Sequence, residues 1–170
     1  DDIYALPEGE RAELIDGHIY YMAPPSRKHQ EISGELYADI KEYIRSHGGR
    51  CKVYAAPFAV YLDERSNTYV EPDISVICDP DKLDDRGCNG APDWIIEVVS
   101  PGSQRMDYMT KLFKYRTADV REYWIVDPAQ ERVQVYLFGE QEDFMQYSFE
   151  EDIPVGIYPE FRINIAELLK

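Results

Sequence analysis

Residues 93–101 read Asp93-Trp94-Ile95-Ile96-Glu97-Val98-Val99-Ser100-Pro101, and the core of this stretch, residues 95–99, is apolar on both sides of a single carboxylate. A run of this kind, apolar on both faces, is typical of a strand in the middle of a covered sheet. A carboxylate left unpaired in such a strand would cost several kcal/mol. Glu97 is therefore expected to contact a metal ion, a cation or hydrogen-bond donors.

Two further charged residues are candidates to join Glu97. Asp73 follows Pro72 in a second strand-like run, residues 69–78, and Lys111 lies in the helix-like segment after Glu97. Consecutive strands usually lie side by side, so the two carboxylates can point to one side of the sheet. Carboxylates, waters and phosphate oxygens are the ligands that Mg²⁺ takes, and the bound metal activates water. The residues indicate a metal-dependent phosphodiesterase with Asp73 and Glu97 as metal ligands and Lys111 as the catalytic cation.

Each of these residues also has a structural interpretation. Asp73 can be a turn residue at the start of a strand, and Glu97 can belong to an ion pair with Lys111 or Arg105. Lys111 can be a solvated helix lysine, paired with Asp107 one turn earlier.

Two more polar residues are candidates for the same site. Asp16-Gly17 predicts a β-hairpin in which Glu13 lies opposite Tyr20. The Glu13 carboxylate is then either an additional metal ligand, a support for the ligands, or a charge on an edge strand. His29 lies on the apolar side of a helix predicted from about residue 27 to residue 47. A core histidine is favoured there over a ligand.

The order of predicted elements is hairpin, helix, three strands, helix and two strands, with weaker strands and a short helix at the C-terminal end. This order predicts one α/β domain over residues 1–170. Residues 53–62 are expected to form one strand that bends at Pro57, and residues 79–92 a long loop. The buried stripe of the helix that precedes Thr117 is predicted to contain Met106, Met109, Leu112 and Phe113.

The charge of the chain argues against a large nucleic-acid-binding surface. The 170 residues carry 18 basic and 33 acidic side chains, a net charge of −15. Nucleic-acid binding uses Lys and Arg to neutralise phosphates, although a local patch remains open, formed by Arg105, Lys111, Lys114, Arg116 and Arg121. The same charge favours divalent cations. It also leaves two other functions open: a non-catalytic module that binds a protein through its acidic surface, and hydrolysis of a small phosphodiester.

Cysteine usage and apolar run lengths give expectations about the compartment. Cys51, Cys78 and Cys88 form neither a CxxC pair nor a Cys/His cluster, so we predict three reduced, packed cysteines without a disulfide or a zinc site. No apolar run approaches the roughly 20 residues of a membrane span, and no signal sequence opens the chain. A cytoplasmic protein is expected.

Several blocks of the chain resemble the bacterial Uma family, which is classed with restriction endonucleases. The resemblance rests on blocks that occur in the family's order, among them residues 13–17, 23–30, 71–76, 93–103, 107–111 and 120–128. The family is similar to the PD-(D/E)XK nucleases, whose core is a mixed sheet flanked by helices in αβββαβ order. Here an N-terminal hairpin and extra C-terminal strands would be added to it.

The resemblance implies roles for individual residues. It implies that Asp73 is the aspartate of the PD motif and that Glu97 fills the (D/E) position. The lysine position two residues after Glu97 holds Val99, which implies that the lysine has moved to the next helix as Lys111. It further implies DNA as the substrate, Mg²⁺ or Mn²⁺ as the cofactor, and a homodimer.

Overall fold

The structure is a computed structural model and describes residues 3–63, 65 and 67–170. Two six-stranded sheets and the helices around them make up most of these residues. The larger core is built on a mixed sheet with the strand order β12-β11-β10-β9-β6-β3. Its strands are β3 (Lys52–Ala55), β6 (Ile74–Ile77), β9 (Trp94–Val98), β10 (Glu122–Asp127), β11 (Arg132–Leu137) and β12 (Asp143–Ser148). In this sheet β9 and β10 run parallel, and the other neighbours are antiparallel.

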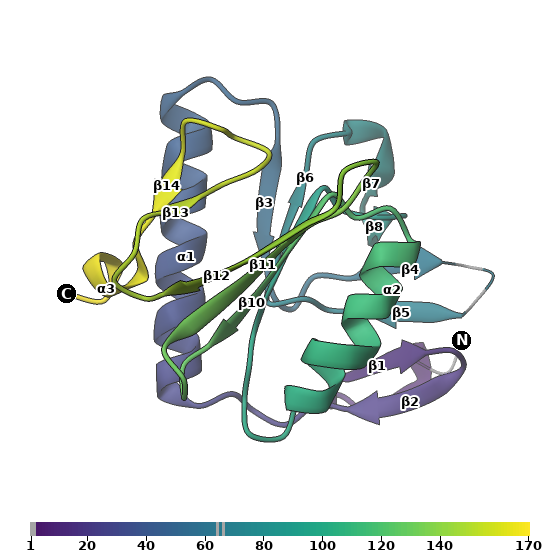
Figure 1. The fold of residues 1–170 in the computed structure, drawn as a ribbon. Coiled ribbons are helices and arrows are strands. Elements are labelled where there is room, and N and C mark those ends of the chain that lie inside the picture. Colours follow the sequence, from purple (N-terminus) through teal and green to yellow (C-terminus); the bar gives the residue numbers. More distant parts are fainter. Residues whose placement is uncertain (1–2, 64, 66) are drawn as a thin grey trace.

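Two helices lie on opposite sides of this sheet (Figure 1). The helix α1 (Arg27–Ser46) begins where the Ser26 hydroxyl accepts a hydrogen bond from the His29 amide, as the N-cap position requires. The helix α2 (Lys111–Thr117) continues a π-helical turn, η3 (Met106–Thr110). The elements α1, β3, β6, β9, α2 and β10 therefore occur in the predicted αβββαβ order.

The second sheet has the order β2-β1-β5-β4-β8-β7. Its strands are β1 (Ala12–Ile15), β2 (His18–Tyr21), β4 (Val60–Asp63), β5 (Thr68–Val70), β7 (Leu83–Asp84) and β8 (Gly87–Asn89). The predicted hairpin register is confirmed, with Glu13 opposite Tyr20. The remaining elements are η1 (Ile3–Ala5), η2 (Pro80–Lys82), β13 (Ile153–Pro154), β14 (Arg162–Ile163) and α3 (Ile165–Leu168).

The side chains of β9 point alternately to the two faces of the sheet, and this determines the face on which Glu97 lies. Trp94, Ile96 and Val98 pack in the core that contains the apolar stripe of α1. Ile95 belongs to the second core, which contains residues of α2 and of the other sheet. Because successive side chains of a strand point to opposite faces, Glu97 lies on the side of Ile95, toward α2.

At two of the places where the chain passes from one sheet to the other, the structure corrects a prediction. Residues 53–62 form two strands, β3 and β4, separated by a cis peptide bond between Ala56 and Pro57. Residues 69–78 likewise form parts of β5 and β6, with Pro72 between them. Proline has no amide hydrogen, so it interrupts a strand ladder and marks the places where the chain leaves one sheet.

The expected loop over residues 79–92 contains η2 and the β7–β8 hairpin. The hairpin can lie against β4 because Gly87 has no side chain. Its φ is +142°, and a Cβ atom at this position would lie 2.2 Å from the Ala59 carbonyl oxygen. Apolar periodicity does not show such a short hairpin.

The predicted buried stripe of the second helix is wrong in part. Met109 and Phe113 are 62% and 61% exposed. The buried residues are instead Asp107, Lys111 and Tyr115. These polar side chains tolerate burial because they bind one another and Glu97.

The prediction of three reduced cysteines is also wrong. Lys52 pairs with Ile77 across β3 and β6, so the next residues outward, Cys51 and Cys78, face each other and form a disulfide. Sequence spacing does not show that two cysteines lie on neighbouring strands. Cys88 is a free buried thiol, and burial raises its pKa to about 11. In the part of the chain that the structure describes, no helix is long and apolar enough to cross a membrane.

Candidate functional site

Asp73 and Glu97 lie on neighbouring strands, as predicted. The strands β6 and β9 are paired, with Ile74 opposite Ile96. Asp73 immediately precedes β6, and its Oδ2 accepts a 2.7 Å hydrogen bond from the Val98 amide. The Asp73 carboxylate is thus fixed at the end of β9, beside Glu97.

His29 contacts this aspartate from α1. The side chain is buried, and its Nε2 lies 3.3 Å from Asp73 Oδ2. Burial lowers the pKa of the imidazole, but the Asp73 carboxylate acts in the opposite direction and the net shift is upward. The structure therefore places His29 as a partner of Asp73 rather than as an isolated core residue.

Lys111 is buried among carboxylates, with only 4% of its surface exposed. Its Nζ lies 2.9 Å from Glu13 Oε2, 3.0 Å from Glu97 Oε1 and 3.9 Å from Asp107 Oδ1. Burial alone would lower the pKa of Lys111, but these carboxylates raise it well above its usual range. Lys111 is consequently a permanent cation at neutral pH, and the solvated-lysine interpretation is excluded.

Glu13 belongs to the same cluster and is not an exposed edge charge. Only 4% of its surface is accessible, and β1 is not an edge strand, since it lies between β2 and β5. Its Oε1 accepts hydrogen bonds from Lys111 Nζ at 3.0 Å and from the Glu71 amide at 2.9 Å. Glu13 therefore joins the second sheet to the lysine.

Three residues of the site were not predicted to belong to it. Tyr115 donates a 2.9 Å hydrogen bond to Glu97 Oε1, and Ser103 donates one of 2.6 Å to Asp107 Oδ2. Tyr123 donates to the Asp107 carbonyl at 2.8 Å. A usable signal for Tyr115 is its spacing, since Asp107, Lys111 and Tyr115 follow one another at four-residue intervals on one helix face.

The cluster carries more negative than positive charge. Three carboxylates, those of Glu13, Glu97 and Asp107, lie within 4 Å of the Lys111 ammonium group. A fourth, that of Asp73, is paired with His29 and acts on the pKa of Glu97. Burial raises the pKa of Glu97 well above its usual range and the pKa of Asp107 to about 6. Repulsion by the neighbouring carboxylates raises both pKa values further. A buried cluster of this kind is stabilised by protons or by another cation.

The donor atoms fit a hydrated Mg²⁺ better than a closed metal cage. Within residues 3–63, 65 and 67–170, no three His, Cys, Asp or Glu side chains are arranged to hold a metal ion. Among the same residues, Asp73 is contacted through Oδ2 and Glu97 through Oε1, and Asp73 Oδ1 and Glu97 Oε2 accept no hydrogen bond. Mg²⁺ is commonly held by one or two carboxylates and keeps several waters, so a pair of carboxylate oxygens is a donor set that it uses.

The cluster predicts how the stability of the metal-free protein depends on pH. An acid whose pKa is higher in the folded state than in the unfolded state stabilises the folded protein while it is protonated. Its contribution to the free energy of unfolding is complete below the pKa of the unfolded state and is lost as the pH rises through the pKa of the folded state. For Asp107 this window runs from 3.8 to about 6, and the upward shift of Glu97 acts in the same direction. The free energy of unfolding in EDTA should fall by at least about 1 kcal/mol between pH 5 and pH 7.5.

Urea unfolding at the two pH values measures this difference. Asp107→Asn removes one of the titrating groups and should reduce the fall. A free energy of unfolding that rises over the same pH interval would contradict the charge excess.

The predicted basic patch is largely neutralised by acidic partners. Lys114 forms an ion pair with Asp16, Arg116 Nε lies 3.6 Å from Glu142, and Arg121 lies 3.2 Å from Asp93. Lys111 is held within the buried cluster. This surface therefore offers a polyanion few free cations.

The fold and the cluster define a class of protein. A mixed sheet in αβββαβ order, with paired acids at the ends of β6 and β9 and a buried lysine on α2, is a restriction-endonuclease-like arrangement. A solved structure with the same fold is that of a "putative nuclease belonging to DUF820" from Anabaena variabilis. Its TM-score is 0.78 at 22% identity, covering 98% of this chain and 94% of that one.

The sequence comparisons give the family. Residues 1–166 match the Uma2 family, described as "Putative restriction endonuclease", and the chain belongs to that family. An uncharacterized protein of Synechocystis sp. is 25% identical over 142 residues, which span 83% of this chain and 73% of the relative.

Proposed function

We propose that this member of the Uma2 family is a Mg²⁺-dependent endonuclease that hydrolyses DNA phosphodiester bonds. Asp73 and Glu97 would hold the metal, for which Mn²⁺ can substitute, and Lys111 would be the catalytic cation. The observation that carries the proposal is the charge excess: three carboxylates contact one ammonium group, and the Asp73 carboxylate lies beside them. Among the described residues, Asp73 and Glu97 each keep one oxygen that accepts no hydrogen bond. A purely structural ion network would instead be expected to balance its charges, because uncompensated buried charge is costly.

The bound metal would supply Lewis-acid activation of the phosphate and a lowered pKa for a bound water. Neighbouring residues would orient the two carboxylates that hold the metal. The Val98 amide and His29 hold the Asp73 carboxylate through Oδ2, and this leaves Oδ1 free. Tyr115 and Lys111 hold Glu97 through Oε1 in the same way.

Lys111 would act as a cation and not as a base. Its pKa is raised by the surrounding carboxylates, so it does not release a proton at neutral pH. A fixed ammonium beside the scissile phosphate stabilises charge that develops in the transition state and can position the attacking water by donating a hydrogen bond.

The net charge of −15 and the neutralised basic patch favour a second candidate, a module that keeps the fold without cleaving DNA and binds a protein partner. DNA cleavage assays distinguish the two. The purified chain should cut single-stranded or double-stranded DNA with Mg²⁺ or Mn²⁺ and not with EDTA, and raising the salt concentration should weaken DNA binding. No cleavage with either metal would reject the nuclease proposal, and no salt-dependent DNA binding would leave the protein-binding module as the better candidate.

A further inference from the structure

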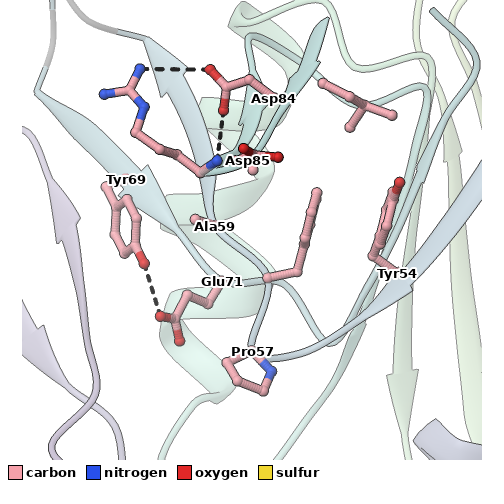
Figure 2. Close-up of a pocket in the computed structure, with 11 residues that line it drawn as sticks. Tyr54, Pro57, Ala59, Tyr69, Glu71, Asp84 and Asp85 are labelled. Atoms are coloured by element: carbon pink, nitrogen blue, oxygen red, sulfur yellow. Dashed lines mark hydrogen bonds and ion pairs between the residues drawn. The ribbon is translucent and has the colours of Figure 1, made fainter. Parts of the chain in front are cut away.

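A cavity lies beside the acidic cluster. Its volume is about 450 Å³, within the range of ligand pockets, and it lies between the β3–β4 passage, the end of β5 and the β7–β8 hairpin. Figure 2 shows Tyr54 on one side of the cavity and Tyr69 and Glu71 on the opposite side, with Pro57 at one end and Asp84 at the other.

Two backbone hydrogen bonds connect this cavity to the candidate metal ligands. The Glu71 amide donates to Glu13 Oε1, the same atom that accepts from Lys111. The Ala56 amide, in the β3–β4 passage, donates to the Asp73 carbonyl at 3.0 Å. Both walls of the cavity are therefore fixed to the residues that would act on a phosphodiester.

One wall is aromatic. The rings of Tyr54 and Phe58 are stacked, with centroids 4.3 Å apart and planes 6° from parallel, and both residues are half-buried. A stacked pair at the edge of a cavity offers a flat apolar face. Such faces bind nucleobases of any sequence by stacking.

The opposite wall is rich in hydrogen-bond acceptors. Glu71 is buried and accepts from Tyr69 and Arg11. Asp84, at the end of the cavity, accepts from the Arg86 amide and from Asn89, and Asp85 adds a third carboxylate. Arg86 is the one basic residue lining the cavity among those described, and it pairs with Asp84 at 3.8 Å. This wall would repel a phosphate and would accept hydrogen bonds from a neutral ring that carries donors.

We propose that the cavity binds an unpaired nucleobase that carries an exocyclic amino group. The base would stack on the Tyr54–Phe58 face and donate its amino group to the carboxylate wall, as cytosine N4 does with Glu or Asp elsewhere. The assignment of the ligand as part of a nucleic acid rests on the proposed nuclease function.

The charge distribution explains why the protein would need such a contact. Proteins that bind nucleic acids through phosphates draw most of their affinity from free Lys and Arg. Here three of the five candidate cations are paired with acids at the surface and Lys111 is buried. A base-binding cavity next to the cluster supplies affinity that the surface charge does not.

Titration with free nucleosides followed by ¹H–¹⁵N NMR tests the proposal. Deoxycytidine and thymidine are pyrimidine nucleosides of similar size, and only the first carries an exocyclic amino group. Deoxycytidine should give saturable shifts at the amides of residues 54–59, 69–71 and 83–87, and thymidine should bind about tenfold more weakly. Equal binding of the two, or no saturable shifts in these segments, would overturn the proposal.

Two variants test the aromatic wall. Phe58→Leu keeps an apolar side chain but removes the ring, and it should weaken deoxycytidine binding about tenfold. Phe58→Trp keeps a ring and should retain binding. Unchanged binding in Phe58→Leu would also overturn the proposal, and the wild-type comparison of the two nucleosides decides the matter if a variant does not fold.

The experiment separates this proposal from the nuclease proposal. Free nucleosides contain no phosphodiester, and the titration is carried out in EDTA, so neither metal binding nor cleavage enters the result. Cleavage without deoxycytidine binding would reject the proposed nucleobase binding and leave the nuclease proposal in place. Deoxycytidine binding without metal-dependent cleavage would reject the nuclease proposal and leave the cavity as a nucleobase site.

Discussion

Glu97→Gln is expected to reduce metal-dependent DNA cleavage by roughly 10³-fold or more, because loss of the metal removes several kcal/mol of transition-state stabilisation. Glutamine has nearly the same shape and keeps an oxygen that can accept from Tyr115 and Lys111. It lacks the second negative oxygen that would bind the metal. The fold should persist, because the buried position would then carry no charge that needs desolvation.

Asp73→Asn should have a comparable effect on cleavage for the same reason. A suitable control is Glu140→Gln, which removes an exposed acid from the β11–β12 turn, outside the cluster. Cleavage rates with Mg²⁺ are compared for the four proteins, and near-UV circular dichroism of the buried Trp94 and Trp124 reports whether each is folded. Full cleavage by both site variants would show that these carboxylates are structural.

Lys111→Met is expected to produce the largest loss of stability. Methionine fills a similar volume, but the variant leaves Glu13, Glu97 and Asp107 facing one another without a cation. Removing one partner of a buried ion pair costs about 3–5 kcal/mol, and we expect a loss of that size at pH 7.5 in EDTA. The loss should be smaller at pH 5, where Asp107 and Glu97 take up protons because their pKa values are raised.

A matched control lies on the same helix. Lys114 pairs with Asp16 at a half-exposed position, and exposed ion pairs contribute about 0–1 kcal/mol. Lys114→Met should therefore change the urea unfolding midpoint little. If the two lysine variants lose the same amount, or if the loss in Lys111→Met does not depend on pH, the account of the buried cluster is wrong.

The strongest local patterns in the sequence predicted much of the fold. Glu97 within an apolar strand correctly indicated a buried carboxylate with partners, and Asp16-Gly17 fixed the hairpin register that places Glu13. These features depend on short-range periodicity and turn chemistry, which a sequence displays directly. The resemblance to the Uma family correctly indicated both the family and the fold.

Features that depend on tertiary contacts were not predictable in the same way. Met109 and Phe113 suggested an apolar helix face, but the helix buries its polar face because Glu97 and Glu13 provide partners from other elements. The Cys51–Cys78 disulfide follows from the pairing of β3 with β6, which sequence separation does not reveal. The cavity beside the site is lined in part by the passage between β3 and β4, at Pro57, where the sequence predicted one bent strand.

The central claim is that Asp73 and Glu97 form a site for a divalent cation. Calorimetric titration of the wild-type chain with Mg²⁺ and with Mn²⁺, repeated on Glu97→Gln, tests it most directly. We predict saturable binding of the metal in the wild type that is absent in the variant, with tighter binding at pH 7.5 than at pH 5.5 because protons compete for the same carboxylates. Weak, non-saturating binding that is identical in the two proteins would contradict the claim and would identify the cluster as a structural ion network.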